Sequence, residues 1–132
     1  MKKSSLDTNA LLRLLLKDVP EQHEMIKQLI AQADRTFLVS DTAIIELVFV
    51  LERHYEFSRS LIKEAIDALV SVTNILININ SIQGALEAYT AHPMLSFEDC
   101  YLAEEAARNN AVPLWTFDKK LARQSEHAQI IN

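Results

Sequence analysis

The chain has 132 residues, an apolar fraction of 49% and a formal net charge of −5 at neutral pH. This length fits a single domain, residues 1–132, with a real hydrophobic core, and the composition excludes disordered and fibrous classes. The negative charge argues against broad electrostatic binding of nucleic acid, although a cluster of carboxylates that binds cations would itself carry such a charge.

Several protein classes are excluded by what the sequence lacks. No apolar run approaches the roughly 20 residues that a membrane span needs, and Asp7 falls where a signal peptide would be apolar. Cys100 is the only cysteine, which excludes an intramolecular disulfide and fits a reducing compartment. We therefore expect a cytoplasmic protein. Gly84 is the only glycine, so glycine-rich phosphate-binding loops are excluded as well.

Short segments rich in branched or aromatic residues are predicted to be strands, apolar on both faces as buried parallel strands are. In chain order they are Ser5–Asp7, Thr36–Ser40, Ile75–Ile79, Pro113–Phe117 and, as a fifth candidate, Ala128–Ile131. Strands separated by helices predict βαβ units, and hence a three-layer α/β/α sandwich around a parallel sheet of four to five strands.

The segments between these strands have the apolar spacing of amphipathic helices. Pro20 and the pair Ser40-Asp41 are typical of helix starts. The apolar helical positions are, in chain order, Leu11, Leu12 and Leu15; Met25, Ile26, Leu29 and Ile30; Ile44, Ile45, Val48 and Leu51; Leu61, Ile62, Ala65, Ile66 and Leu69; and parts of the ranges 85–89, 101–107 and 121–122.

Acidic residues recur near the carboxyl ends of the predicted strands, where open parallel sheets place their chemistry. Asp7 and Asp118 close the first and fourth strands, and Asp99 begins a helix that follows the third. Each of these aspartates has a second interpretation as a helix N-cap. Glu46 lies in a helix that is otherwise apolar, so we expect its carboxylate to be partly buried and to need a cation.

Four carboxylates without other ligands favour magnesium or manganese, because hard cations prefer oxygen donors whereas zinc prefers histidine and thiolate. The histidines His23, His54, His92 and His127 show no paired spacing and are expected at the surface. Oxygen-bound divalent metals typically serve phosphodiester hydrolysis, and no protein nucleophile is then required. The sequence therefore predicts a metal-dependent nuclease with Asp7, Glu46, Asp99 and Asp118 as metal-binding and catalytic residues.

The acidic motifs resemble those of PIN-domain ribonucleases, and more narrowly the VapC-type toxins of bacterial toxin–antitoxin pairs. The motifs are Leu6-Asp7-Thr8-Asn9, Glu46 followed by Val48-Phe49-Val50-Leu51-Glu52, Phe97-Glu98-Asp99 with Leu102-Ala103, and Thr116-Phe117-Asp118-Lys119-Lys120-Leu121. They occur in the family's order over nearly the whole chain. The sequence departs from many relatives at Ser96, where those carry a further aspartate, and Glu98 is a candidate replacement.

The resemblance implies a sheet order of 3-2-1-4-5, with Asp7 and Asp118 as neighbours on a shared metal. It also implies an endoribonuclease that acts as the toxin of a type II system, forms homodimers and is inhibited by a co-encoded antitoxin. Operator DNA would be bound only through that antitoxin.

Further residues have supporting roles in this interpretation. Asn9 and Thr116 are candidates to order metal-bound waters or the acids, although both are also typical turn residues. Arg13, Lys119, Lys120 and Arg123 are candidate contacts to RNA phosphates, with a solvated helix face as the alternative. Cys100 is expected to be a small packed side chain, because no histidine base is positioned to activate it.

Other functions remain open on the sequence alone. A DNA-directed nuclease of flap type uses similar acids, but those enzymes are longer and carry basic surfaces. A receiver domain would need an aspartate at the end of the third strand, where Asn78 and Asn80 stand. A silent scaffold of the same fold would use only its surface. Such a surface is indicated by apolar residues beyond the core pattern, namely Leu14, Leu16, Leu47, Phe49 and Val50.

Overall fold

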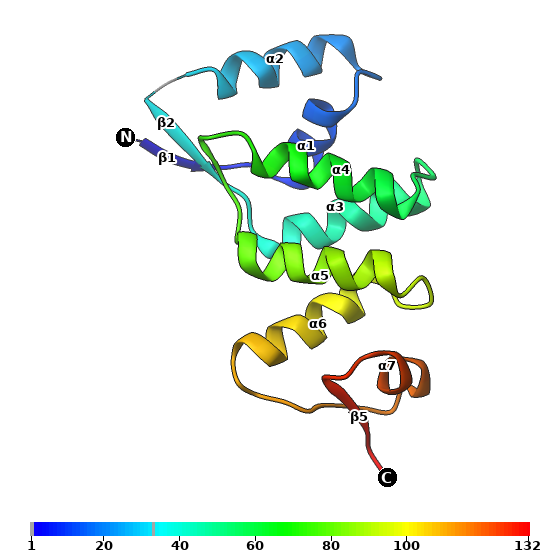
Figure 1. The fold of residues 1–132 in the computed structure, drawn as a ribbon. Helices are drawn as coiled ribbons and strands as arrows, with labels where there is room; N and C mark the ends of the chain where they lie inside the picture. Colours follow the sequence, from blue (N-terminus) through cyan, green and yellow to red (C-terminus); the bar gives the residue numbers. More distant parts are fainter. Residues whose placement is uncertain (1, 33) are drawn as a thin grey trace. The chain divides into compact units, whose positions relative to one another are not determined.

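The structure is a computed structural model that describes residues 2–32 and 34–132. The chain divides into two compact units, Met1–Asn78 and Ile79–Asn132 (Figure 1). The positions of the two units relative to one another are not determined. Each unit has an α/β fold in which parallel strands are flanked by helices, as predicted. None of the described helices is long and apolar enough to cross a membrane.

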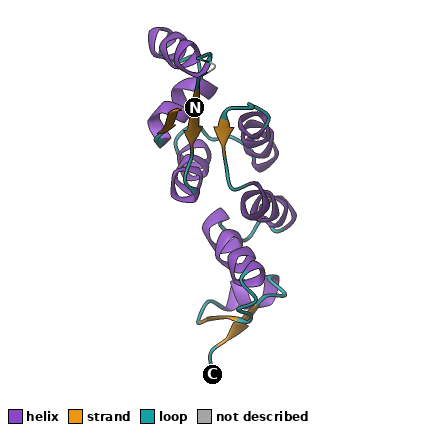
Figure 2. Cartoon of the chain, turned by 90° about the vertical axis from the view of Figure 1, so that its left-hand side faces the viewer, coloured by secondary structure: helices purple, strands orange, loops and turns teal. Residues whose placement is uncertain are grey.

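The first unit is built from βαβ connections around a parallel sheet. Its elements are β1 (Lys2–Ser5), α1 (Thr8–Leu15), α2 (Pro20–Ile30), β2 (Arg35–Leu38), α3 (Asp41–Arg53), α4 (Arg59–Val70) and β3 (Ile75–Leu76). The strands pair in the order β1-β2-β3, so β2 is central, with Phe37 opposite both Ser4 and Ile75. Helices connect each strand to the next, as Figure 2 shows by colour.

Helix starts in this unit follow the sequence signals. The Ser40 hydroxyl accepts a hydrogen bond from the Ala43 amide at 3.2 Å, so Ser40 is the N-cap of α3, as the Ser40-Asp41 pair predicts. Ser58 caps α4 in the same way. Pro20 occupies the start of α2, where its missing N–H costs no helical hydrogen bond. Local sequence therefore determines where these helices begin.

The core of the first unit lies around α3, which packs against α1 and α4. Its apolar side chains with at most 1% exposure are Leu11, Phe37, Ile44, Leu47, Val48, Leu51, Ile62, Ile66 and Leu69. Each such burial contributes about 1.5–3 kcal/mol. The expectation that Leu47 belongs to a surface patch is wrong, because Leu47 lies one turn from Leu51 on the inner face of α3. Phe49 on the outer face is 58% exposed, as expected.

The second unit pairs two helices and adds a small parallel sheet. Its elements are α5 (Ile79–Ala91), α6 (Phe97–Arg108), β4 (Leu114–Thr116), α7 (Lys119–Gln124) and β5 (Ala128–Ile130). β4 pairs with β5, with Trp115 opposite Gln129. α5 and α6 pack against each other, and the rings of Tyr89 and Phe97 meet edge to face at a centroid distance of 5.6 Å.

Gly84 of α5 faces the side chain of Glu104 on α6. A Cβ atom built at Gly84 would overlap the carboxylate of Glu104, which also forms an ion pair with Arg108 at 3.2 Å. Any larger residue at Gly84, the only glycine of the chain, therefore requires the flexible end of the Glu104 side chain to move.

Three predicted strands have wrong boundaries. The second strand ends at Leu38 rather than at Ser40, because Ser40 already caps α3. The first strand is Lys2–Ser5 rather than Ser5–Asp7, because its pairing with Arg35–Leu38 fixes the register and Asp7 already caps α1. The third strand ends at Leu76, and Ile79 begins α5. Short apolar runs fit a buried strand and a buried helix equally well, so their boundaries are poorly encoded.

The order of the strands agrees with the expected order within each unit. The described strands form the sheets β1-β2-β3 within the first unit and β4-β5 within the second, which match the segments 3-2-1 and 4-5 of the predicted order. The expectation that the strands are buried on both faces is wrong, because the side chains of Leu38 and Trp115 are 55% and 56% exposed. Successive residues of a strand point to opposite faces, and in these sheets one face is the better covered.

Candidate functional site

Asp7 lies two residues beyond β1 and begins α1. Its Oδ1 atom accepts a hydrogen bond from the Ala10 amide at 2.8 Å, so Asp7 is the N-cap of this helix. The side chain is exposed, and no ion pair to it is present among the described residues. An ionised carboxylate offers about four lone-pair directions. Capping and cation binding are therefore compatible for Asp7.

Glu46 lies in the second turn of α3, and it is exposed rather than partly buried as predicted. The buried face of α3 consists of Ala43, Ile44, Leu47, Val48 and Leu51, so Glu46 shares the outer face with Thr42 and Phe49. The argument that burial obliges Glu46 to have a cation is therefore wrong. Its availability to a cation rests instead on its place in a hollow.

Asp7 and Glu46 line one open hollow of about 750 Å³ in the first unit. We call it the Asp7–Glu46 hollow; its other polar lining residues are Ser5, Thr8, Asn9, Ser40 and Thr42. The apolar side chains of Ile26 and Leu29 from α2 form another part of its wall. Two predicted acids from different helices, and the predicted supporting residue Asn9, thus meet in one concave surface.

Thr8 is a residue of this region that the sequence interpretation did not single out. Its side chain is buried, with 8% exposure, and its hydroxyl donates a hydrogen bond to the Ala43 carbonyl at 3.2 Å. The bond joins the first residue of α1 to the first turn of α3. A signal was present in the sequence, because Thr8 shares helical spacing with Leu11, Leu12 and Leu15 and so falls on the inner face.

Arg13 is held within the first unit. Its guanidinium forms an ion pair with Asp18 at 3.0 Å and donates to the Tyr55 hydroxyl at 3.2 Å, while Tyr55 donates to Asp18 at 3.1 Å. The hydrogen bond to Tyr55 raises the pKa of Arg13 above its ordinary value; desolvation opposes this, and the attraction of Asp18 adds to the rise. These contacts occupy donors that the predicted contact to RNA would use.

Asp99 is the third residue of α6 and does not cap it. The cap is Ser96, whose hydroxyl accepts a hydrogen bond from the Asp99 amide at 3.1 Å. Ser96 therefore has a defined structural role, because it caps the first turn of α6. Asp99 is half-buried, and the neighbouring Glu98 is exposed. No ion pair to either is present in the described part of the chain.

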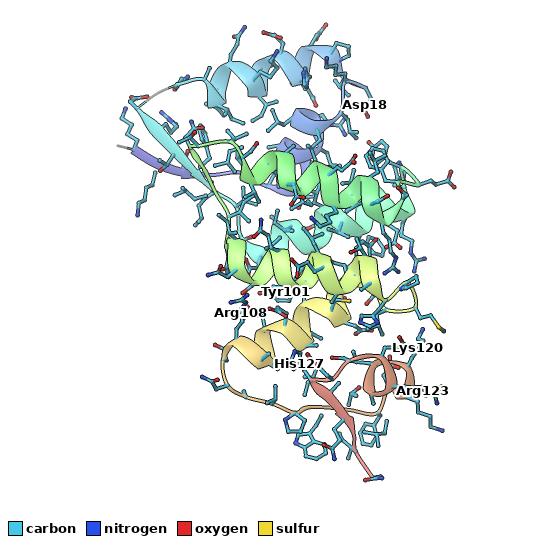
Figure 3. All side chains as sticks on the ribbon, in the orientation of Figure 1. Asp18, Tyr101, Arg108, Lys120, Arg123 and His127 are labelled. Carbon is cyan, nitrogen blue, oxygen red and sulfur yellow. The ribbon has the colours of Figure 1, made fainter. Side chains whose placement is uncertain are left out.

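Asp118 caps α7 and is exposed. Its Oδ1 atom accepts hydrogen bonds from the amides of Lys120 and Leu121 at 2.9 and 3.1 Å. The Asp118 amide in turn donates to the Thr116 hydroxyl at 2.9 Å, so Thr116 fixes the backbone that carries this acid. Lys119, Lys120 and Arg123 are exposed on α7, where Figure 3 labels two of them. Cys100 is buried and free of disulfide, as predicted.

The four predicted acids are divided between the units, with Asp7 and Glu46 in the first and Asp99 and Asp118 in the second. Residues 2–32 and 34–132 contain no group of three or more His, Cys, Asp or Glu side chains that would hold a metal ion. Magnesium needs fewer protein ligands than this, since it keeps several waters and is often bound by one or two carboxylates. The donor chemistry of the Asp7–Glu46 hollow therefore fits Mg²⁺ or Mn²⁺.

The chain resembles a known protein family and known structures. Residues 5–126 match the PIN domain family. A chain in the crystal structure of VapBC2 from Rickettsia felis bound to a DNA fragment from their promoter is similar in fold, with 18% identity, 98% coverage of each chain and a TM-score of 0.40. The comparison with curated proteins gives no match. PIN domains are typically nucleases and generally bind Mg²⁺. With the match covering nearly its whole length, the chain belongs to the PIN domain family.

Proposed function

We propose that the protein is a Mg²⁺- or Mn²⁺-dependent endoribonuclease that hydrolyses RNA phosphodiesters. One observation carries the proposal: in a PIN domain, Asp7 and Glu46 share one hollow, both exposed and neither in an ion pair among the described residues. Carboxylates without cationic partners are suited to bind a divalent metal. Asp99 and Asp118 complete the proposed metal-binding and catalytic set.

The chain's own residues would hold the acids and the substrate. The Ala10 amide orients the Asp7 carboxylate, and the amides of α7 orient that of Asp118. Asn9 lines the Asp7–Glu46 hollow, where its amide group can hydrogen-bond water or a phosphate oxygen. A bound divalent metal supplies positive charge for the phosphate and acidifies a water, so no protein nucleophile is needed.

Phosphate contacts are proposed on α7. Lys119, Lys120 and Arg123 are exposed and follow Asp118 directly, which places positive charge on the same element as a proposed metal ligand. Arg13 is a weaker candidate because Asp18 and Tyr55 already engage its guanidinium. A few local cations on a chain of net charge −5 favour short, single-stranded contacts over long duplexes. RNA is therefore preferred to the duplex DNA of flap-type nucleases.

We also propose that the protein is the toxin of a type II system and forms a homodimer. The sequence motifs support this, as does apolar surface beside the Asp7–Glu46 hollow. Ala10, Met25, Ile26 and Leu29 line a largely apolar groove of about 680 Å³ between α1 and α2, and Met25 is 69% exposed. Phe49, on α3, is also exposed. Such a surface fits an amphipathic segment of a co-encoded antitoxin, through which operator DNA would be bound.

The antitoxin interface is tested by charge substitution. Met25→Glu and Phe49→Glu are expected to weaken antitoxin binding while RNA cleavage is retained, because both side chains lie outside the acidic set. Leu61→Glu is the matched control, since Leu61 is 43% exposed on α4. Equal antitoxin affinity for all three variants would place the interface elsewhere. A clean monomer in sedimentation of the isolated chain would contradict the homodimer.

The nuclease proposal is tested by metal removal. Cleavage of a mixed RNA substrate is expected to disappear in EDTA and to return with Mg²⁺ or Mn²⁺. Ca²⁺ is expected to bind but to support little turnover, because its larger and looser shell positions water and phosphate poorly. Each metal that binds should raise the melting temperature of the protein. Cleavage that persists in EDTA would contradict the mechanism, and metal binding without any cleavage would favour a silent scaffold.

A further inference from the structure

The hydrogen bond of Thr8 joins the two chain segments that carry the acids of the Asp7–Glu46 hollow. Thr8 directly follows Asp7, and Ala43 precedes Glu46 by almost one helical turn. The 3.2 Å bond from the Thr8 hydroxyl to the Ala43 carbonyl is buried and spans 35 positions of sequence. Among the described residues, the buried side chains that carry a hydroxyl are those of Thr8, Ser81 and Tyr89, so a buried hydroxyl is rare in this part of the chain.

A buried hydroxyl at this position has no role in closing the helix itself. The α1 N-cap is Asp7, and the Ala43 carbonyl lies inside α3, where the helix pattern gives it a second donor four residues later. A valine at position 8 would fill nearly the same space without burying a polar group. What the hydroxyl adds is a directional link, which fixes how α1 is rotated and shifted along α3.

We propose that Thr8 is a positioning residue that sets the spacing of the Asp7 and Glu46 carboxylates for metal binding. This inference rests on the proposed function of these two acids. The hydrogen bond lies close to both acids, because Thr8 is one residue from Asp7 and Ala43 is three residues from Glu46. Loss of the hydroxyl removes neither carboxylate, but the position of α1 along α3 is then no longer fixed. The affinity for the metal should therefore fall while the fold persists.

The opposite end of α1 supplies a matched control. There Arg13 donates to the Tyr55 hydroxyl beyond the end of α3, and Asp18 bridges the two. Tyr55→Phe removes this second link between the same segments but lies away from the acids. It therefore separates a local effect on the Asp7–Glu46 hollow from a general loosening of α1 against α3.

The experiment measures Mn²⁺ affinity by titration of the whole chain, together with the melting temperature in the absence of metal. Thr8→Val is expected to weaken Mn²⁺ binding by roughly 10-fold, the lower end of what loss of an outer-shell partner costs in metal sites. Thr8→Ser keeps the hydroxyl and is expected to restore the affinity to within a fewfold of the original. Tyr55→Phe is expected to retain it. Thr8→Ala serves as a second variant should Thr8→Val fold poorly.

Two outcomes would overturn the inference: unchanged Mn²⁺ affinity in Thr8→Val or Thr8→Ala, or an equal loss in Tyr55→Phe. Failure of Thr8→Ser to rescue binding would also overturn it, because the hydroxyl would then not be the active feature. The variant Asp7→Asn tests the proposed metal site separately from the role of Thr8. If Asp7→Asn bound Mn²⁺ like the original chain, the proposed metal site itself would be wrong, whatever the Thr8 variants did.

Discussion

The two units hold their acids in different ways. In the first unit, Asp7 and Glu46 come from segments far apart in sequence, line one hollow and are linked by the buried Thr8–Ala43 hydrogen bond. In the second, Asp99 lies in the first turn of α6 and Asp118 is the N-cap of α7. The neighbours that hold them, Ser96 and Thr116, are two or three residues away.

This difference separates tertiary from local control of a functional side chain. The spacing of Asp7 and Glu46 depends on how α1 packs against α3, so substitutions in that packing should reach the acids. The orientation of Asp99 and Asp118 depends on capping hydrogen bonds within three residues, which form with the helix itself. The spacing of the first pair should therefore respond to core changes, whereas the orientation of the second pair, like that of the capping residue Asp7, should respond to changes in the caps.

The largest expected effect comes from neutralising the acids. Asp7→Asn, Glu46→Gln and Asp99→Asn should each lower RNA cleavage by at least about 100-fold, because even outer-shell partners of metals contribute 10- to 100-fold. Single-turnover cleavage in Mg²⁺ measures this. The metal-free melting temperature should stay unchanged or rise, since asparagine also caps helices and like charges are removed. Full activity of Asp7→Asn would show that the acid pair of the first unit has no catalytic role.

Asp118 gives a smaller effect that sharpens the comparison. Asp118→Asn should lower cleavage less than the other three substitutions, because we propose that this acid is peripheral and binds only a second metal or its waters, in place of the metal shared with Asp7 that the resemblance implies. Asp118→Ala should in addition cost about 1 kcal/mol of unfolding free energy through loss of the α7 cap. Denaturant unfolding of both variants measures that cost. Identical stability of the two would argue that capping does not hold this helix.

Much of the fold and part of the site could be predicted from sequence. The alternation of strands and helices, the Ser40 cap and most inner positions of α1 and α4 follow from local patterns, and so does the position of Asp7 and Asp118 at helix starts. Leu61, on the predicted apolar face of α4, is however 43% exposed. The exposure of Glu46 could not be predicted in this way, because the residues that precede and follow it in the sequence are apolar. Only the packing of α3 decides which of those neighbours are covered.

Other features depended on tertiary structure in the same sense. Leu47 and Phe49 are both apolar and two residues apart, yet one is fully buried and the other 58% exposed. The segment Ile75–Ile79 is predicted from sequence to be one strand, but backbone pairing extends only to Leu76 and Ile79 is the first residue of α5. The Thr8–Ala43 hydrogen bond joins residues 35 positions apart. The sequence pattern indicates only that Thr8 lies on the inner face of α1, not which residue it contacts.

The central claim is that the acids of both units serve one metal-dependent reaction, and a double-mutant cycle tests it most directly. Single-turnover RNA cleavage is measured for Asp7→Asn, Asp99→Asn and the double variant in Mg²⁺. Residues that act together in one site are not additive, so the double variant should be about as slow as either single variant, roughly 100-fold below the original chain. Losses that multiply to about 10,000-fold would show that the two acids act independently and would contradict the account.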